Sequence, residues 1–218
     1  MEAPLELLLK NEGLLRIARL QDRVIAHMYR SSNGVAMHGG TCVWRCYGGK
    51  RFSYDIDMYA KNKNEIERVI NAIKLARFFV TKQKERKGKK ELFYYKVSDG
   101  NTKMTVEFNS ERRINRSIAT YINTDGTFVD IFSISTEDLI KEKIAAYESR
   151  RAIKDLYDLY ILSHFIKSEK SSENMKTFIQ TIQKPADEEL LKQLIYGGAV
   201  PTFSQMVDYI ERHYEIYK

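Results

Sequence analysis

Hydrophobic and polar positions follow two different periods in the first part of the chain, which predicts a mixture of helices and strands. Apolar residues recur every three or four positions over residues 5–30 and 65–75, a spacing typical of helices with one buried face. A short helix is expected at 42–47, between two glycine pairs. Short apolar or alternating runs predict strands over residues 34–37, 52–59, 77–83, 92–98, 102–109 and 128–134.

The pattern changes after residue 135, where only helical periods follow. The sequence Ser135-Thr136-Glu137-Asp138 resembles a capping box with Asp in place of Glu, which indicates a helix start. Helices are expected over residues 137–150, 152–167, 172–183, 187–196 and 203–216. We therefore predict an α+β fold, with a mixed-sheet α/β domain over 1–135 and a helical domain over 136–218.

Composition and charge narrow the function classes. The 218 residues are 43% hydrophobic and 11% aromatic, which suits a packed globular core rather than a disordered chain. The net charge is +7, but residues 61–120 alone hold 16 Lys and Arg against 7 Asp and Glu, an excess of 9. A basic concentration of this kind favours a polyanionic partner, with nucleic acid first. A solvated, lysine-rich surface is the alternative.

The compartment is expected to be the cytoplasm. No apolar run approaches the roughly 20 residues that cross a membrane. The N-terminus lacks the features of a signal peptide. The two cysteines, Cys42 and Cys46, are too few for a zinc site and are interpreted as packing residues in a reducing environment.

Two aspartates in the predicted strand at 52–59 are the first candidates for chemistry. Alternate residues of a strand point to one face, so Asp55 and Asp57 should lie together. Crowded carboxylates repel each other, and a divalent ion such as Mg²⁺ or Mn²⁺ removes that cost. Upstream, Gly39-Gly40 lets the backbone approach a ligand, and Thr41 is expected to cap the next helix and present its N–H groups to a phosphate.

A third carboxylate is needed to complete a two-metal site. Glu107 interrupts an apolar strand in "MTVEFN" and is the preferred candidate. Asp130, in "FVDIF", is the rival.

The order of these motifs resembles the AbiEii-type nucleotidyltransferases, which are toxins of type IV toxin–antitoxin and abortive-infection systems. The matching segments, over roughly residues 30–165, are "GGT" (39–41), "RFSYDID" (51–57), "EKIAAYESR" (142–150) and "KDLYDLYIL" (154–162). His38 stands where this family often has a basic residue, and Lys154 where it often has Arg. The resemblance implies a polymerase β-like nucleotidyltransferase fold.

The resemblance also implies roles for individual residues. Asp55 and Asp57 would bind the metal ions, and Glu107 is proposed for the third acid, which in such folds is commonly Asp. Gly39, Gly40, Thr41, Arg51 and Ser53 would hold the nucleotide. Lys143 would contact the triphosphate or the leaving pyrophosphate, and Asp155 or Asp158 would complete the site. From helix spacing alone, Lys143 would be a surface lysine and Asp155 would pair with Arg151.

The predicted function is metal-dependent transfer of a nucleotide from an NTP to RNA, with the tRNA 3′ end as the first candidate acceptor and a cognate antitoxin as partner. The loop "KERKGKK" (84–90), with Arg112, Arg113 and Arg116, would form a groove for the RNA backbone, or would be a solvated loop. The alternatives are a protein or small-molecule acceptor, or a binding or regulatory protein that has lost catalysis.

Overall fold

The chain divides into two compact units. In the computed structural model, which describes residues 3–86, 91–111, 113–166 and 169–215, the sheet unit comprises Met1–Cys46 and Ser53–Ile134. The helical unit comprises Tyr47–Phe52 and Ser135–Lys218. The predicted division at 135/136 differs from this one mainly in the segment 47–52, which groups with the helical unit.

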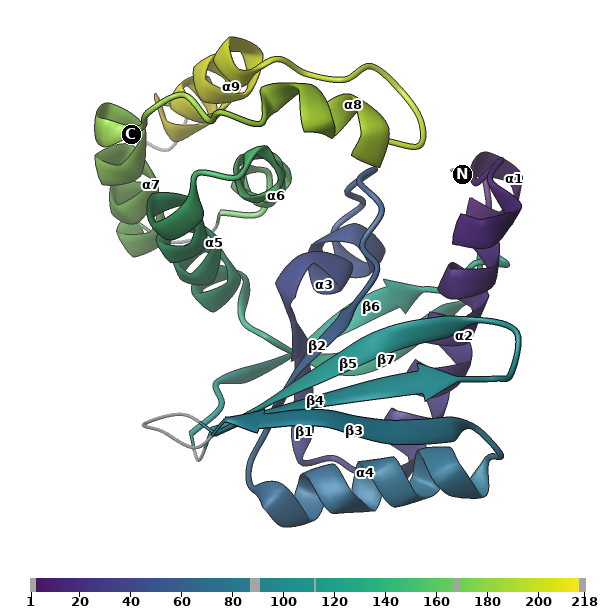
Figure 1. The fold of residues 1–218 in the computed structure, drawn as a ribbon. Coiled ribbons are helices and arrows are strands. Elements are labelled where there is room, and N and C mark those ends of the chain that lie inside the picture. Colours follow the sequence, from purple (N-terminus) through teal and green to yellow (C-terminus); the bar gives the residue numbers. More distant parts are fainter. Residues whose placement is uncertain (1–2, 87–90, 112, 167–168, 216–218) are drawn as a thin grey trace. The chain divides into compact units, whose positions relative to one another are not determined.

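One mixed sheet forms the centre of the sheet unit (Figure 1). Among the described residues it has seven strands in the order β3-β4-β5-β2-β1-β7-β6. In the middle of the sheet, β2 pairs in parallel with β5 and antiparallel with β1, and β1 pairs in parallel with β7. The strands are β1 (Val35–His38), β2 (Ile56–Ala60), β3 (Phe79–Arg86), β4 (Glu91–Ser98), β5 (Lys103–Ser110), β6 (Arg116–Ile122) and β7 (Phe128–Ile134). The predicted α+β class with a mixed sheet is confirmed.

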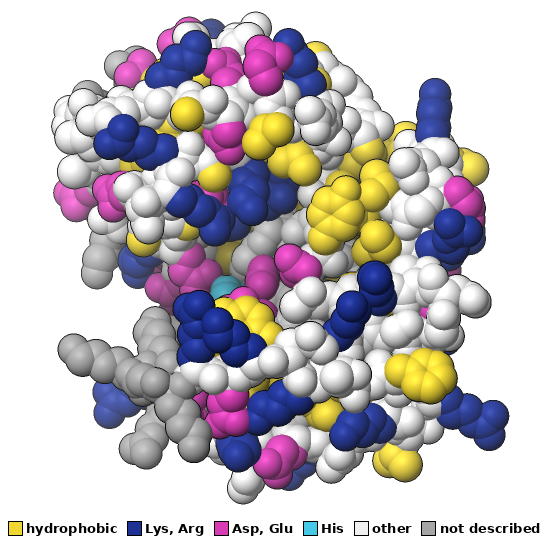
Figure 2. All heavy atoms as spheres, viewed as in Figure 1, with side chains coloured by type: hydrophobic (Ala, Val, Ile, Leu, Met, Phe, Trp, Pro, Cys, Tyr) yellow, Lys and Arg dark blue, Asp and Glu magenta, His cyan; other side chains and the backbone are white. Residues whose placement is uncertain are grey.

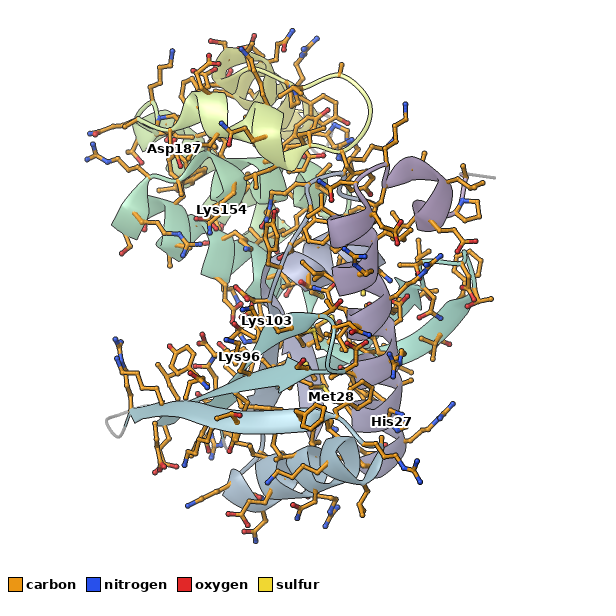
Figure 3. All side chains as sticks on the ribbon, turned by 45° about the vertical axis from the view of Figure 1, so that its right-hand side comes forward. His27, Met28, Lys96, Lys103, Lys154 and Asp187 are labelled. Carbon is orange, nitrogen blue, oxygen red and sulfur yellow. The ribbon has the colours of Figure 1, made fainter. Side chains whose placement is uncertain are left out.

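One face of this sheet is apolar and carries the core of the unit. Ile56 of β2 is paired with Val106 of β5, and Met58 with Phe108, and all four are fully buried. The helices α2 (Glu12–Ser31) and α4 (Lys63–Leu75) pack against the sheet and each other, and Figure 1 shows them along the same side. Met28 of α2 is fully buried in this layer (Figure 3). The opposite face of β2 and β5 is left for polar side chains.

Asp22 of α2 is the centre of a buried polar network in the sheet unit. Its Oδ2 accepts hydrogen bonds from the Thr124 amide (2.8 Å) and hydroxyl (2.6 Å). Its Oδ1 accepts from the Tyr121 hydroxyl at 2.9 Å and from the guanidinium of Arg45, which is 1% exposed. Arg45 lies on α3 (Gly39–Cys46), the helix that follows β1, so this network fixes α3 to α2.

The helical unit is built on α5 (Thr136–Arg150) and α6 (Ile153–Ser163), which pack together. Ser135 caps α5 by accepting a hydrogen bond from the Asp138 amide at 3.2 Å, as the sequence predicts. Asp187 (Figure 3) accepts from the Ile153 amide at 2.8 Å at the start of α6. The remaining helices are α7 (Glu169–Thr181), the 3₁₀ turn η1 (Glu188–Leu190), α8 (Leu191–Leu194) and α9 (Phe203–Glu215), with the single turn α1 (Leu5–Leu8) belonging to the sheet unit.

Backbone hydrogen bonds attach the segment 47–52 to the helical unit. The Phe52 amide donates to the Leu194 carbonyl at 2.9 Å, and the Tyr196 amide donates to the Lys50 carbonyl at 3.1 Å. The Lys50 amide donates to the Tyr157 hydroxyl of α6 at 3.0 Å. These bonds resemble a short piece of β ladder, which satisfies the backbone of a segment that would otherwise be a loop.

Several predicted elements differ from the observed ones. The helix predicted over 5–30 is divided at residues 9–11, where the Asn11 side chain caps α2. The strand predicted over 52–59 begins only at Ile56, since residues 47–52 belong to the helical unit. The predicted helix 187–196 is the turn η1 followed by α8. The strand β6 was not predicted.

No helix among the described residues is both long enough and apolar enough to span a membrane.

We predict that Asp22→Ala lowers the free energy of unfolding by about 3 kcal/mol, because it leaves the Arg45 guanidinium buried without its counter-charge. Urea denaturation followed by circular dichroism measures this change. Asp130→Ala is the control: Asp130 is exposed and accepts a hydrogen bond from Thr120, and its removal should change stability by less than about 0.5 kcal/mol. Equal effects of the two substitutions would contradict a stabilising role for the network.

Candidate active site

A row of polar side chains crosses four neighbouring strands on the face of the sheet opposite the apolar core. His38 of β1 is paired with Asp57 of β2, Asp57 with Glu107 of β5, and Glu107 with Tyr94 of β4. Directly paired residues of adjacent strands point to the same face, with Cβ atoms about 5 Å apart. The backbone register therefore places two carboxylates next to each other, between an imidazole and a phenol.

The ionisation of Glu107 reflects this crowding. Burial raises the pKa of Glu107 above its usual value, and the negative charge of Asp57 raises it further. His38, Tyr94 and Asn109 lower it without cancelling these effects. Glu107 is therefore a carboxylate whose charged form costs free energy in the folded protein, and a cation between it and Asp57 would recover that cost.

Tyr59 and Asn109 add an aromatic and a polar side chain to this face, two residues further along their strands than the carboxylates. The His38 ring stacks on Tyr59 with 4.2 Å between centroids. The Asn109 amide nitrogen lies 3.4 Å from the Glu107 Oε1 and 3.4 Å from the His38 Nε2. Tyr59 and Asn109 each follow a carboxylate by two positions, so strand alternation puts them on the same face.

Gly39 allows the Asp57 carboxylate to lie directly against the turn between β1 and α3. Its φ is +72°, a left-handed conformation that favours glycine. A Cβ built at this position would lie 2.8 Å from the Asp57 carboxyl carbon, which is closer than real contacts permit. The glycine is thus required both by the backbone conformation and by the aspartate beside it.

Thr41 does not have the predicted capping role. The helix α3 begins at Gly39, so Thr41 is the third residue of the helix and is fully buried. Its hydroxyl donates to the Asp55 carbonyl and thereby fixes the chain just before β2. The Ser53 carbonyl accepts from the Gln21 side chain at 2.9 Å. These bonds position the strand that carries Asp57 beside the start of α3.

The carboxylates fit a divalent ion that is shared with a substrate. Among the described residues, no three His, Cys, Asp or Glu side chains form a ready metal-binding group. The pair Asp57 and Glu107, with Asp55 exposed just before β2, offers oxygen ligands only. Mg²⁺ is usually bound by one or two carboxylates, waters and substrate phosphates rather than by a complete protein cage. The donor set therefore fits Mg²⁺ or Mn²⁺ together with a phosphate ligand.

A second charged cluster lies inside the helical unit. Arg51 makes two hydrogen bonds to the Asp158 carboxylate, at 2.8 and 2.7 Å. The Lys143 ammonium lies 2.7 Å from Asp158 and 3.5 Å from Asp155. Asp155 also accepts two 2.7 Å hydrogen bonds from Arg150. Asp155 and Asp158 are 0% and 1% exposed, so their charges depend on these three cations.

Opposing effects set the pKa of Asp158. Burial alone would raise this pKa, but Arg51 and Lys143 lower it below its ordinary value. The carboxylate is therefore ionised at neutral pH. Arg51 is itself 6% exposed, and its bidentate geometry is the strongest form of ion pair available to a carboxylate.

The predicted site residues fall into two groups. The sheet unit contains Gly39, Gly40, Thr41, Ser53, Asp55, Asp57 and Glu107, and the helical unit contains Arg51, Lys143, Asp155 and Asp158. The rival carboxylate Asp130 is paired with Thr120 and is exposed. Ser133 of β7 pairs with Met37 of β1. Asp130 therefore lies about four residues away from His38, measured along the strand direction. Glu107, in contrast, is the direct neighbour of Asp57.

Sequence reasoning assigned no role to Tyr59, Asn109 or Arg150, and interpreted Tyr94 as a strand-core residue, with base stacking as the alternative. Strand alternation could have identified Tyr59 and Asn109, since each lies two positions after a carboxylate. Tyr94 depends on the pairing of β4 with β5, which no local pattern specifies. Asp155 pairs with Arg150 rather than with Arg151, because α5 ends at Arg150 and the i−4 spacing does not apply across the break.

Only part of the predicted basic groove lies within the described residues. Residues 87–90 and Arg112 lie outside the described residues. Arg116 donates to the Asn33 carbonyl and lies over the Phe132 ring, 4.8 Å from its centroid, so it is held against the sheet. On the face shown in Figure 2, the basic side chains of the sheet unit, in the lower half, are scattered and have acidic side chains among them.

The chain matches one protein family and resembles several solved structures. Residues 28–202 match the family described as nucleotidyl transferase AbiEii toxin, type IV toxin–antitoxin system. The chain resembles the crystal structure of a "putative nucleotidyltransferase from H. pylori" with a TM-score of 0.61 and 16% identity, covering 94% of this chain and 95% of that one. It also resembles JHP933 from Helicobacter pylori, with a TM-score of 0.59 and 15% identity over 94% and 92% of the two chains.

A third solved structure is similar over a shorter part of the chain. ANT(2")-Ia, in complex with adenylyl-2"-tobramycin, has a TM-score of 0.53 and 11% identity, covering 75% of this chain and 97% of that one. No curated protein sequence matches the chain. At these identities the structural similarities establish the fold, which is that of nucleotidyltransferases.

We predict that Gly39→Ala destabilises the protein more than Gly100→Ala. Both glycines have positive φ values, +72° and +99°, which cost an alanine about 1–2 kcal/mol. Only at Gly39 would the new Cβ overlap the Asp57 side chain, whereas at Gly100 it would meet Phe79 at an ordinary 3.8 Å. Urea denaturation should show an additional loss of about 1–3 kcal/mol for Gly39→Ala. Equal losses would show that the turn does not enclose Asp57.

We predict that Asp158→Asn lowers the free energy of unfolding by about 3 kcal/mol at pH 7, because Arg51 and Lys143 lose their counter-charge. The folded-state pKa of Asp158 is lowered, so its contribution is complete above the unfolded pKa of about 3.9 and is lost as the pH falls through the folded value. The difference between wild type and Asp158→Asn should therefore shrink below about pH 4.

Urea titrations at a series of pH values measure this difference. Glu189→Gln is the matched control, because Glu189 pairs with Lys192 at the surface with 81% of its side chain exposed. It should change stability by less than about 0.5 kcal/mol at every pH. A difference between wild type and Asp158→Asn that stays constant down to pH 2 would contradict the assigned ion pairs.

Proposed function

The chain belongs to the AbiEii nucleotidyl transferase toxin family of type IV toxin–antitoxin systems, and we propose that it transfers a nucleotide from an NTP to RNA with a divalent metal ion. The acceptor that we propose is the 3′ end of an RNA, with tRNA as the first candidate. The family also supports a cognate antitoxin as partner, and the proposed substrates suit a protein of the cytoplasm.

The observation that carries this proposal is the position of Asp57, which is paired with Glu107 on the next strand and lies against Gly39. A nucleotidyl transfer needs a place where triphosphate oxygens and protein carboxylates can share a cation. Here the carboxylates are adjacent by strand register, and the glycine turn beside them opens the helix α3, whose first N–H groups have no partner within the helix. A purely structural sheet would have no use for two like charges side by side.

The chemistry assigns a simple part to each group. An acceptor hydroxyl oxygen forms a bond to the α-phosphorus of the NTP, the bond from this phosphorus to the pyrophosphate oxygen breaks, and the hydroxyl proton is released to solvent. Held by Asp55, Asp57 and Glu107, Mg²⁺ or Mn²⁺ would supply charge neutralisation between the carboxylates and the phosphates. Gly39 lets the Asp57 carboxylate lie against the start of α3, where the phosphates would bind, and Thr41 and Ser53 fix the chain beside it.

Lys143, Asp155 and Asp158 enter the proposal through the family resemblance, which assigns Lys143 to the phosphates of the substrate or product. Their contacts in the helical unit support a positioning part for the two aspartates, which hold the Lys143 ammonium at 2.7 and 3.5 Å. Arg51, which was expected to touch the nucleotide, supports the same cluster through Asp158. We therefore propose Arg51 as a residue that positions Asp158.

The alternatives to RNA are of two kinds: a different acceptor, or a protein without catalysis. The fold shared with ANT(2")-Ia, whose structure contains an adenylylated tobramycin, favours a small-molecule acceptor as the second candidate, and a protein hydroxyl is a related one. A regulatory protein that binds NTP without transfer is the third. The excess of basic residues over 61–120 favours RNA over both.

We predict that purified protein with Mg²⁺ and each radiolabelled NTP in turn will label a band in total RNA, and that EDTA will abolish the label. Asp57→Asn should lower the transfer rate at least about 100-fold, because one carboxylate of the adjacent pair loses its charge. The matched control is Asp130→Asn, on β7 of the same sheet, which should retain the wild-type rate.

The other outcomes separate the alternatives. Label found only on protein, or only on a small-molecule acceptor, would replace RNA with that acceptor class. No label on any acceptor, together with no Mg²⁺-dependent binding of NTP, would indicate the non-catalytic alternative. Equal rates for wild type and Asp57→Asn would exclude the carboxylate pair as the centre of the reaction.

A further inference from the structure

The helical unit contains a cavity that none of the predicted site residues lines. Its volume is about 600 Å³, which is within the range of small-molecule and cofactor sites. The walls come from three places: the segment 47–52, the helix α6, and the loop from Gly197 to Pro201 with the α9 helix that follows. All of these lie within the helical unit, so the cavity belongs to one compact body.

Aromatic rings form one wall of this cavity. Tyr157 and Tyr160 of α6 and Tyr209 of α9 all line it. Tyr160 meets Tyr209 at 4.9 Å between centroids with an angle of 73°, an edge-on contact. Three tyrosines around one space provide apolar ring surface together with hydroxyl groups, a combination suited to a flat, polar ring.

Tyr209 is held in place by two histidines. Its ring is stacked on His164 and on His213, each 4.7 Å away, and its hydroxyl lies 2.6 Å from the His164 Nε2. The two imidazoles are only 5.1 Å from each other, so they lie on the same side of the Tyr209 ring rather than sandwiching it. Tyr209 is thus a supported platform whose position does not depend on a ligand.

The charge of the lining is of one sign. Lys50 and Arg212 line the cavity, and among the described residues no Asp or Glu does. The loop at Gly197-Gly198 adds backbone without side chains, and Gly198 has a φ of +84°, so the chain can approach a bound molecule closely there. Cations and close backbone beside aromatic rings suit a ligand that is both flat and anionic.

We propose that this cavity binds one nucleotide of a single-stranded RNA, with the base against Tyr209 and Tyr160 and the phosphate near Lys50 and Arg212. The inference rests on the proposed function for the choice of RNA as the ligand. It is a binding site, and no covalent step takes place there. It would give the protein a hold on its acceptor that does not require base-specific hydrogen bonds.

Binding to a short fluorescein-labelled oligoadenylate, measured by fluorescence anisotropy, tests the proposal. The protein carries Asp57→Asn throughout and no NTP is added, so that transfer cannot contribute. Tyr209→Ala should weaken binding about 5- to 100-fold, as expected for the loss of one stacked base, whereas Tyr209→Phe should retain most of the affinity. Arg212→Ala should reduce the slope of log K against log salt concentration by about 0.7.

Lys192→Ala is the matched control, because Lys192 is a surface cation of the same unit, with 66% of its side chain exposed, and does not line the cavity. It should leave the affinity near that of the parent protein. Arg212 is exposed, so its removal tests the site without disturbing the fold, and circular dichroism checks each variant.

Each result of this experiment decides the question. If Tyr209→Ala and Arg212→Ala bind like the parent, or if the parent does not bind the oligonucleotide, the proposal is overturned. Competition by AMP but not by adenosine or inorganic phosphate alone would support joint recognition of base and phosphate. If the labelled-NTP assay modifies RNA while the cavity variants bind normally, the proposed function stands and this inference fails.

Discussion

The structure depends on one unfavourable proximity, the placement of the Asp57 and Glu107 carboxylates on adjacent strands. Strand pairing alone brings them together, and the neighbouring charge and burial raise the pKa of Glu107. A protein retains such a pair only where something compensates for the repulsion. The Gly39 turn packs against the same aspartate, so the place where negative charge accumulates lies directly beside the start of α3. This is where we propose that the protein and the NTP share a cation.

In the helical unit, by contrast, two buried carboxylates are surrounded by three cations. Asp158 lies between Arg51 and Lys143, and Asp155 between Lys143 and Arg150. Such an arrangement is costly to desolvate, and hydrophobic replacements of buried ion clusters are often equally stable. We therefore regard the cluster as a device for holding Lys143 in one position rather than as a source of stability. The tyrosine-lined cavity of the same unit is separate from this cluster in its residues and in its chemistry.

Much of the fold could be predicted from the sequence, because helices and strands of an α+β protein leave clear periods. The runs that became α2, α4, β4, β5 and β7 have an apolar face that the core requires, and Ser135 shows its capping role directly. The strand β6 was missed because its outer positions are exposed at the sheet edge, so its alternation is weak. Contacts between residues that are far apart in the sequence could not be predicted. Arg51 and Asp158 are 107 positions apart, and no local pattern links them. The candidate carboxylates were found by residue type, whereas Tyr94 and Arg150 depend on tertiary pairing.

The segment Tyr47–Phe52 has a consequence for how this protein can change over time. The chain leaves the sheet unit after Cys46, returns to it at Ser53 and leaves it again after Ile134, so the helical unit is not one continuous stretch of sequence. A gene fragment that begins at Ser135 would encode Asp158 without Arg51, and recombination at a single crossover would separate these partners. Replacing the helical part with that of a relative would need three coordinated junctions, after Cys46, after Phe52 and after Ile134. We therefore expect the two units to evolve together within one protein, even if their surfaces diverge.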